Sequence, residues 1–162
     1  MAENPHKSSQ VQKLISEGLK NLGKPQGKRE IATWLMPNVF QTLINEKTTF
    51  KTPLVKLTEG DISHFFGSRK NPKQVLSEKQ VKNFYYYLNN PDEIWLDKKD
   101  ESINFICYLQ KDEIVDNRDV IKINIKIDKS NKQEPINYIG SAGRVSSRDI
   151  MKDKERYKKI KG

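Results

Sequence analysis

The segment Val120–Ile127, with the sequence VIKINIKI, decides the fold, because apolar and polar residues alternate along its whole length. Successive side chains of a β-strand point to opposite faces of a sheet, so this period of two predicts a strand with isoleucines on one face. Lys122, Asn124 and Lys126 then share the other face, which we expect to stay open to a ligand. A slip of one residue in the pairing would exchange the two faces.

Three neighbouring segments also have strand-like composition: Glu93–Asp97, Asn104–Gln110 and Ile136–Ser141. The loops between them are short, and Asp128–Glu134 is typical of an exposed hairpin loop. This arrangement predicts a mostly antiparallel, four-stranded sheet. A further strand is expected at 50–57, where Pro53 favours the edge of a sheet.

Apolar residues at helical spacing predict helices elsewhere in the chain. The expected segments are 8–22, 28–35 with a resumption at 39–44 after Pro37, 62–66, 78–88 capped by Ser77, and 147–160. The fold class is therefore α+β, with N-terminal helices followed by the sheet. We expect residues 1–48 to be a helical N-terminal extension and residues 49–162 to be the main domain.

The composition excludes several classes of protein. No apolar stretch approaches the roughly 20 residues that a membrane-spanning helix needs, and Cys107 as the single cysteine rules out an internal disulfide. The 162 residues carry a formal charge of +9, distributed as +3 over 1–48, +1 over 49–139 and +5 over 140–162. The basic ends are compatible with a polyanionic partner, but also with ordinary solvated charge.

One combination of residues indicates chemistry on RNA, namely His64, Arg69, Lys70, the polar face of 120–127 and the segment 138–146. Cleavage of RNA without a metal needs a base for the 2′-hydroxyl, an acid for the leaving oxygen and cations around the phosphorus. Histidine suits the first two tasks, because its ordinary pKa is near 6.5. His64 is therefore a candidate, although it is equally typical of a helix surface. Gly140 and Gly143, on either side of Ser141, indicate tight backbone geometry at the end of a strand.

From about Thr52 to Gly162 the chain resembles the phage branch of the barnase–EndoU–colicin E5/D–RelE (BECR) nuclease superfamily. The form that it is most similar to is the C-terminal domain of head-morphogenesis proteins of the phage Mu type. The resemblance covers roughly two-thirds of the chain and rests on the order of five segments: TPLVKLTEGDISHFF, RKNPKQVLS, YYYLNNPDEIWLD, VIKINIKI and SAGRVSSRDIMKDKERYKKIKG.

The resemblance implies a ribonuclease-like α+β fold and RNA cleavage by acid–base chemistry, with no metal or other cofactor. Some relatives have a second histidine where this chain has Lys70-Asn71-Pro72, which argues against catalysis by a histidine pair. Carried over by position, the catalytic residues are His64, Ser141 and Arg144. The substrate-binding residues carried over in the same way are Arg69, Lys70, Lys122, Lys126, Tyr138 and Ser146.

Three functions remain open at this point. The first is a ribonuclease, a toxin or phage effector in the cytoplasm or the virion, with RNA such as tRNA as substrate and an inhibitor (immunity) protein or a phage structural protein as a further partner. The second is a module for RNA binding or virion assembly whose catalysis has lapsed. The third is an adaptor that docks helices 8–22 and 28–45 on a partner chain.

Overall fold

The computed structural model describes residues 5–22, 24, 27–65, 74–127 and 136–162. The expected hairpin loop at 128–134 lies outside these residues. The described chain is α+β, as predicted, and its elements are α1 (Pro5–Lys20), β1 (Arg29–Trp34), α2 (Pro37–Asn45), β2 (Leu54–Thr58), α3 (Glu59–Phe65), α4 (Glu78–Lys82), α5 (Phe84–Asn89), β3 (Glu93–Asp97), β4 (Ser102–Tyr108), β5 (Val120–Ile127), β6 (Asn137–Val145) and β7 (Tyr157–Lys161), with short 3₁₀ turns at Lys111–Glu113 and Ser147–Asp149.

All the described strands belong to one seven-stranded sheet in the order β1-β2-β6-β5-β4-β3-β7. The run from β3 to β6 is the predicted antiparallel meander. The expectation of a four-stranded sheet is nevertheless wrong, because β1, β2 and β7 extend the meander at both ends. The sheet is also mixed, since β2 pairs with β6 in parallel.

Two of these added strands were expected to be helices. In β1 the pairing with β2 shifts between Ile31 and Thr33, and the adjacent residues Ala32 and Thr33 are both buried. Such a bulge removes the period of two that identifies a strand in a sequence. In β7 three of the five residues are lysines, and the strand forms because its backbone pairs with β3. Long-range pairing thus overrides the helical propensity of a segment rich in charged residues.

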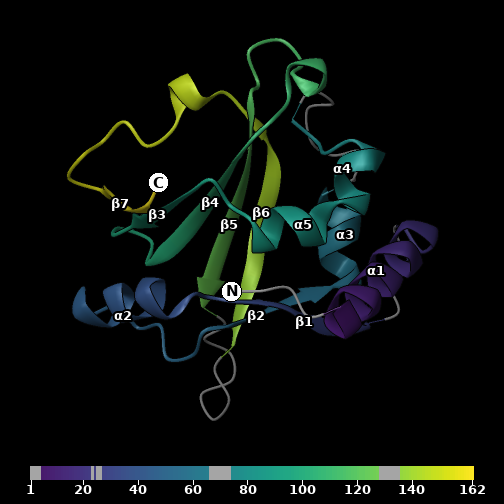
Figure 1. The fold of residues 1–162 in the computed structure, drawn as a ribbon, viewed down its shortest axis with the longest axis horizontal. Coiled ribbons are helices and arrows are strands. Elements are labelled where there is room, and N and C mark those ends of the chain that lie inside the picture. The colour runs from purple at the N-terminus through teal and green to yellow at the C-terminus, as the bar shows by residue number, and fades with distance from the viewer. Residues whose placement is uncertain (1–4, 23, 25–26, 66–73, 128–135) are drawn as a thin grey trace.

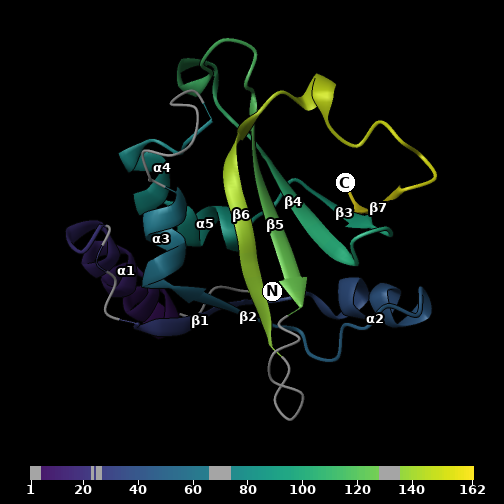
Figure 2. The same ribbon diagram turned by 180° about the vertical axis from the view of Figure 1, so that it is seen from behind.

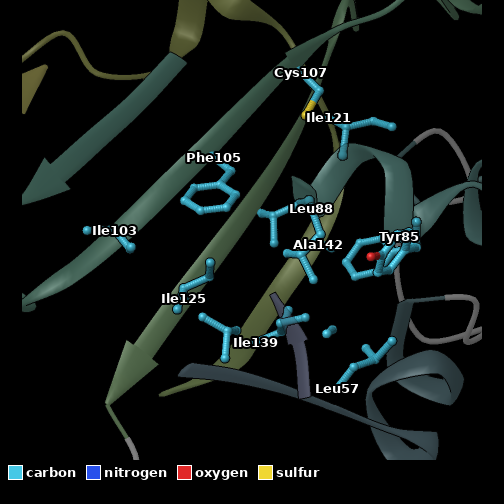
Figure 3. Close-up of a cluster of buried hydrophobic side chains, with 14 of the residues drawn as sticks. Leu57, Tyr85, Leu88, Ile103, Phe105, Cys107, Ile121, Ile125, Ile139 and Ala142 are labelled. Atoms are coloured by element: carbon cyan, nitrogen blue, oxygen red, sulfur yellow. The ribbon is translucent and has the colours of Figure 1, made fainter. Parts of the chain in front are cut away.

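The helices α1, α3, α4 and α5 cover one face of the sheet, and α2 lies apart from them near β7 (Figures 1 and 2). The covered face carries the isoleucines of β5, and Ile121, Ile123 and Ile125 are fully buried. Figure 3 shows the same core, to which the strands contribute Ile103, Phe105, Ile139 and Ala142, and helix α5 contributes Tyr85 and Leu88. The predicted register of β5 is therefore confirmed.

Residues from the N-terminal third share this core. Val11, Leu14 and Ile15 of α1 are buried in the same cluster as the sheet isoleucines, and β1 is hydrogen-bonded to β2. The adaptor hypothesis requires these apolar faces to bind a partner chain. In the structure they pack against the sheet of the same chain. Where the sequence predicts one helix over 78–88, the chain forms α4 and α5 with a break at Asn83, and Ser77 caps α4 as predicted.

Candidate functional site

The face of the sheet opposite the helices, which we call the open face, carries the polar side chains of β5. Lys122, Asn124 and Lys126 are half-buried there, as the alternation of the sequence predicts. Strand pairing places Asn104 of β4 and Ser141 of β6 on either side of Asn124. The Asn124 Nδ2 donates to Asn104 Oδ1 at 2.9 Å and to Ser102 Oγ at 3.0 Å. These hydrogen bonds fix a polar row across the strands.

The connection between β6 and β7, residues 146–156, is called the crossover here (Figures 1 and 2). It packs on part of the open face through buried Met151. Its Met151 forms a small second core with Ile106 and Val120, against which Trp95 and Tyr157 pack. Near this cover, burial lowers the pKa of Lys122, and the charge of Arg156 lowers it further, while Asp97 opposes the shift. Lys122 is therefore an enclosed cation, whereas Lys126 borders open space.

A cavity of about 510 Å³ lies at the uncovered end of this face, and we call it the sheet-face cavity. Its lining comes from β2, α3, the β3–β4 turn, β5 and β6: Lys56, Thr58, Asp61, Asp100, Glu101, Lys126, Ile127 and Tyr138. Pairing of β6 with both β2 and β5 sets Tyr138 between Lys56 and Lys126. Two of the sequence-predicted residues, Lys126 and Tyr138, are thus brought together.

Gly140 allows the side chain of Lys126 to lie across β6. A Cβ atom at this glycine would approach the Lys126 Cδ to 3.1 Å and the Asn124 Oδ1 to 3.1 Å. Such distances are shorter than ordinary van der Waals contact, so a larger residue would displace the lysine stem. The tight geometry expected at Gly140 therefore has a definite consequence for the position of a cation in the cavity.

Asp61 and His64 belong to the short helix α3 at the wall of the cavity. Thr58 N donates to Asp61 Oδ2 at 2.9 Å, and Asp61 N donates to Thr58 Oγ1 at 3.1 Å, which is a capping box that fixes the start of the helix. Burial raises the pKa of Asp61, although the bonds from Thr58 and the charges of Lys56 and His64 oppose the shift. His64 is exposed one turn further along α3.

The two acidic residues of the β3–β4 turn in the cavity have partners. Asp100 forms an ion pair with Arg156, with 3.2 Å between Oδ2 and Nη2, and Glu101 Oε2 accepts a hydrogen bond of 2.5 Å from Thr49. Arg156 and Thr49 therefore offset part of the negative charge of Asp100 and Glu101. Lys56 of β2 and Lys126 of β5 supply the positive charge of the same cavity.

Other residues predicted for the site lie elsewhere. Arg144 is buried on the helix-covered face, where its Nε donates to the Val75 carbonyl at 2.8 Å and its backbone N donates to the Gln74 carbonyl at 2.7 Å. Ser146 is buried at the end of β6 and accepts a bond from Arg148 N. The two hydrogen bonds of Arg144 hold residues 74 and 75 against β6. Arg69 and Lys70 lie outside the described residues.

Sequence reasoning missed Lys56, Asp61 and the pair formed by Asp97 and Arg156. The spacing Thr58-x-x-Asp61 is a recognisable capping box, and it indicates the start of a helix but not the wall of a cavity. Lys56 joins the site only through the parallel pairing of β2 with β6. Asp97 is the buried last residue of β3, and its partner Arg156 lies 59 positions further along the chain.

Within the described residues, no group of three or more His, Cys, Asp or Glu side chains is arranged to hold a metal ion. The same part of the chain contains no helix that is long and apolar enough to span a bilayer. Comparison of the chain with protein-family models, with curated proteins and with solved structures finds no match.

Proposed function

We propose that the protein is a metal-independent ribonuclease whose scissile phosphodiester binds in the sheet-face cavity. One observation carries the proposal: Lys56, Lys126 and Tyr138, from three strands, line one cavity together with Asp61, one helical turn from His64. Cations, a hydroxyl and two groups capable of proton transfer are the components that this reaction requires. The antiparallel meander β3–β6 with helices on one face also supports a BECR-like fold.

In the proposed reaction the Asp61 carboxylate accepts the proton of the ribose 2′-hydroxyl, and the 2′-oxygen attacks phosphorus. The bond from phosphorus to the 5′-oxygen breaks, and protonated His64 donates a proton to that oxygen. The products are a 2′,3′-cyclic phosphate and a 5′-hydroxyl. The raised pKa of Asp61 makes its carboxylate a stronger base than an ordinary aspartate. Asp61 thus takes the place of a second histidine.

The remaining groups of the site bind and stabilise. Lys56 and Lys126 neutralise the charge that grows on the nonbridging oxygens in the transition state, and the Tyr138 hydroxyl donates to the same phosphate. Ser141 lies beside Asn124 in the polar row and contacts the neighbouring nucleotide. Arg144 takes no part in this proposal, because it is buried on the helix-covered face.

The experiment is incubation with total RNA, with and without EDTA, for the wild type, His64→Ala, Asp61→Asn and the exposed control Asp112→Asn. We expect cleavage that resists EDTA, cyclic phosphate ends by mass spectrometry, and a loss of about 10²- to 10⁴-fold for the two site variants only. Cleavage by His64→Ala at the wild-type rate would show that this mechanism is wrong.

A second candidate is a module that binds RNA or assists virion assembly without catalysis. It is favoured by the scarcity of histidines, because the sequence contains only two, and by Asp100 and Glu101, which oppose a scissile phosphate in the sheet-face cavity. Binding and cleavage measured on one preparation separate the candidates, since binding without turnover supports the second. The proposed ribonuclease acts in the cytoplasm or the virion, with an inhibitor (immunity) protein or a phage structural protein as a further partner.

A further inference from the structure

Aromatic rings and cations alternate on the open face at the junction of β3 and β7. The ammonium groups of Lys154 and Lys159 each lie 5.3 Å from the centroid of the Trp95 ring. The guanidinium carbon of Arg156 lies 5.0 Å from the centroid of the Tyr157 ring. Two neighbouring rings are therefore flanked by three cations from the crossover and β7, in a segment that the mechanism above does not use.

Strand register connects these rings to the polar row beside the sheet-face cavity. Trp95 pairs with Lys159 of β7 on one side and with Asn104 of β4 on the other. Asn104 in turn pairs with Asn124 of β5, and Asn124 with Ser141 of β6. Because directly paired residues share a face of the sheet, one row of side chains runs from Lys159 across five strands to Ser141.

The Trp95 ring is held in a fixed orientation. Its Nε1 donates to Glu93 Oε1 at 2.8 Å, and the ring packs against the second core formed by Ile106, Val120 and Met151. Lys154 is exposed, and the Lys159 side chain retains 43% of its exposure. The Lys159 ammonium also lies 3.8 Å from Glu93 Oε1. A rigid ring with solvent-exposed cations above it can exchange one cation for a flat ligand while the other contacts a neighbouring anion.

Such an alternation suits single-stranded nucleic acid, in which unpaired bases stack on aromatic rings and phosphates follow the cations. In a duplex the base faces are covered by their neighbours, so that a single ring on a sheet surface has no base to stack on. We infer that Trp95, Tyr157, Lys154 and Lys159 form a base-stacking subsite for single-stranded RNA outside the sheet-face cavity. The choice of RNA rests on the proposed function.

The subsite is tested with a fluorescein-labelled, uncleavable 2′-O-methyl dodecamer, either single-stranded or annealed to its complement. Intrinsic fluorescence is recorded in Trp34→Phe protein, because Trp34 and Trp95 are the only tryptophans in the sequence. We expect the single strand to quench Trp95 and to bind more tightly than the duplex. Trp95→Ala should weaken binding about 5- to 100-fold, as expected for the loss of one stacked base, with Trp34→Ala as the matched control.

Because Trp95 also packs in the second core, Lys154→Gln provides a test that leaves this packing intact. We expect it to weaken binding and to reduce the slope of log K against log salt by about 0.7, the value for one phosphate contact on a single strand. Lys13→Gln, at an exposed position on α1, should leave the slope unchanged. Equal binding of single strand and duplex, unchanged affinity in both Trp95→Ala and Lys154→Gln, or no binding at all would overturn the subsite.

The same experiments distinguish a failure of the base-stacking subsite from a failure of the proposed ribonuclease function. If His64→Ala loses cleavage while Trp95→Ala and Lys154→Gln bind and cleave as the wild type does, the ribonuclease stands and the subsite falls. If no preparation cleaves RNA and Trp95 is still quenched by the single strand, the subsite stands and the ribonuclease falls.

Discussion

Asp97 and Arg156 form a two-point ion pair, in which Nε donates to Oδ1 at 2.9 Å and Nη2 donates to Oδ2 at 2.8 Å. Asp97 is the last residue of β3, and Arg156 directly precedes β7. The Asp97 carboxylate also accepts from the backbone N–H groups of Lys99 and Asp100. This pair therefore attaches the end of the crossover to the sheet, and it holds Tyr157 in place beside β3.

The Asp97–Arg156 pair predicts an acid-sensitive contribution to stability. Burial by itself raises the pKa of Asp97, but the bonds from Arg156, Asp100 and Lys99 hold the pKa below its ordinary value. A lowered carboxyl pKa stabilises the folded state above the unfolded pKa of about 4, and this stabilisation is lost as the pH falls further. We expect Asp97→Asn to have a lower free energy of unfolding than the wild type at pH 7. At pH 3 we expect the difference in free energy of unfolding between the two proteins to be smaller.

Urea denaturation at the two pH values measures this effect. Asp100→Asn is the matched control, because its carboxylate is exposed and shares only one contact with Arg156. A difference between wild type and Asp97→Asn that is equally large at pH 3 and pH 7 would contradict the assignment of the stabilisation to the ionised carboxylate.

Gly143 is required by the close approach of another backbone segment. A Cβ atom at this position would lie 2.8 Å from the Gln74 carbonyl oxygen, which also accepts from Arg144 N. We expect Gly143→Ala to cost about 1–3 kcal/mol in free energy of unfolding, as overpacking usually does. Gly60→Ala is the control, since its Cβ would meet only Thr58 Oγ1 at 3.6 Å and alanine favours a helix. Equal stability of the two variants in thermal melts would refute the close contact.

The helix α1 is an integral part of the core, and this leads to a prediction that opposes the adaptor hypothesis. Leu14 is 3% exposed, whereas Leu22, just beyond the helix, is 41% exposed. We expect Leu14→Ala to destabilise the protein by about 2–5 kcal/mol and Leu22→Ala by less than about 0.5 kcal/mol. If chemical denaturation gives the same small loss for both, α1 does not pack on the sheet in solution.

The sequence identifies those elements in which local pattern and tertiary environment agree. In β5 one face meets the helices and the other does not, so the alternation of VIKINIKI is directly visible, and its boundaries were predicted as observed. β1 was missed because its bulge buries Ala32 and Thr33 in succession. β7 was missed because three of its five residues are lysines and none of the five is buried, so that only its pairing with β3 makes it a strand.

The residues of the candidate site also divide into those that local sequence pattern predicts and those that only contacts between distant segments bring together. Lys126 shares the polar face of its predicted strand, and the pairing of β5 with β6 brings Tyr138 beside it in one cavity. The resemblance carries Arg144 over to the same site, but the strand register turns its side chain toward the helices. Lys56 and Asp61 reach the cavity through contacts between distant segments, for which a single sequence contains no local signal.

Asp61 offers a variant that separates catalysis from folding. Its pKa is raised, so the folded state binds a proton more tightly than the unfolded state, and stability from this group falls as the pH rises from about 4 through the folded pKa. At pH 7 the ionised carboxylate is therefore a cost. Asparagine removes this cost and keeps an acceptor for the Thr58 N–H. We expect Asp61→Asn to be as stable as the wild type at pH 7, or more stable, while RNA cleavage falls about 10²-fold or more.

The pH profile of cleavage supplies the readout that a purely structural role would not change. In the wild type, the acidic limb of kcat/KM should report the raised pKa of Asp61, and it should disappear in Asp61→Asn. Asp61→Glu, which restores a carboxylate, should recover part of the activity and the limb. If Asp61→Asn unfolds at pH 7, the ionised carboxylate stabilises the fold, which contradicts the raised pKa of Asp61. If it is stable and fully active, the base lies elsewhere in the sheet-face cavity.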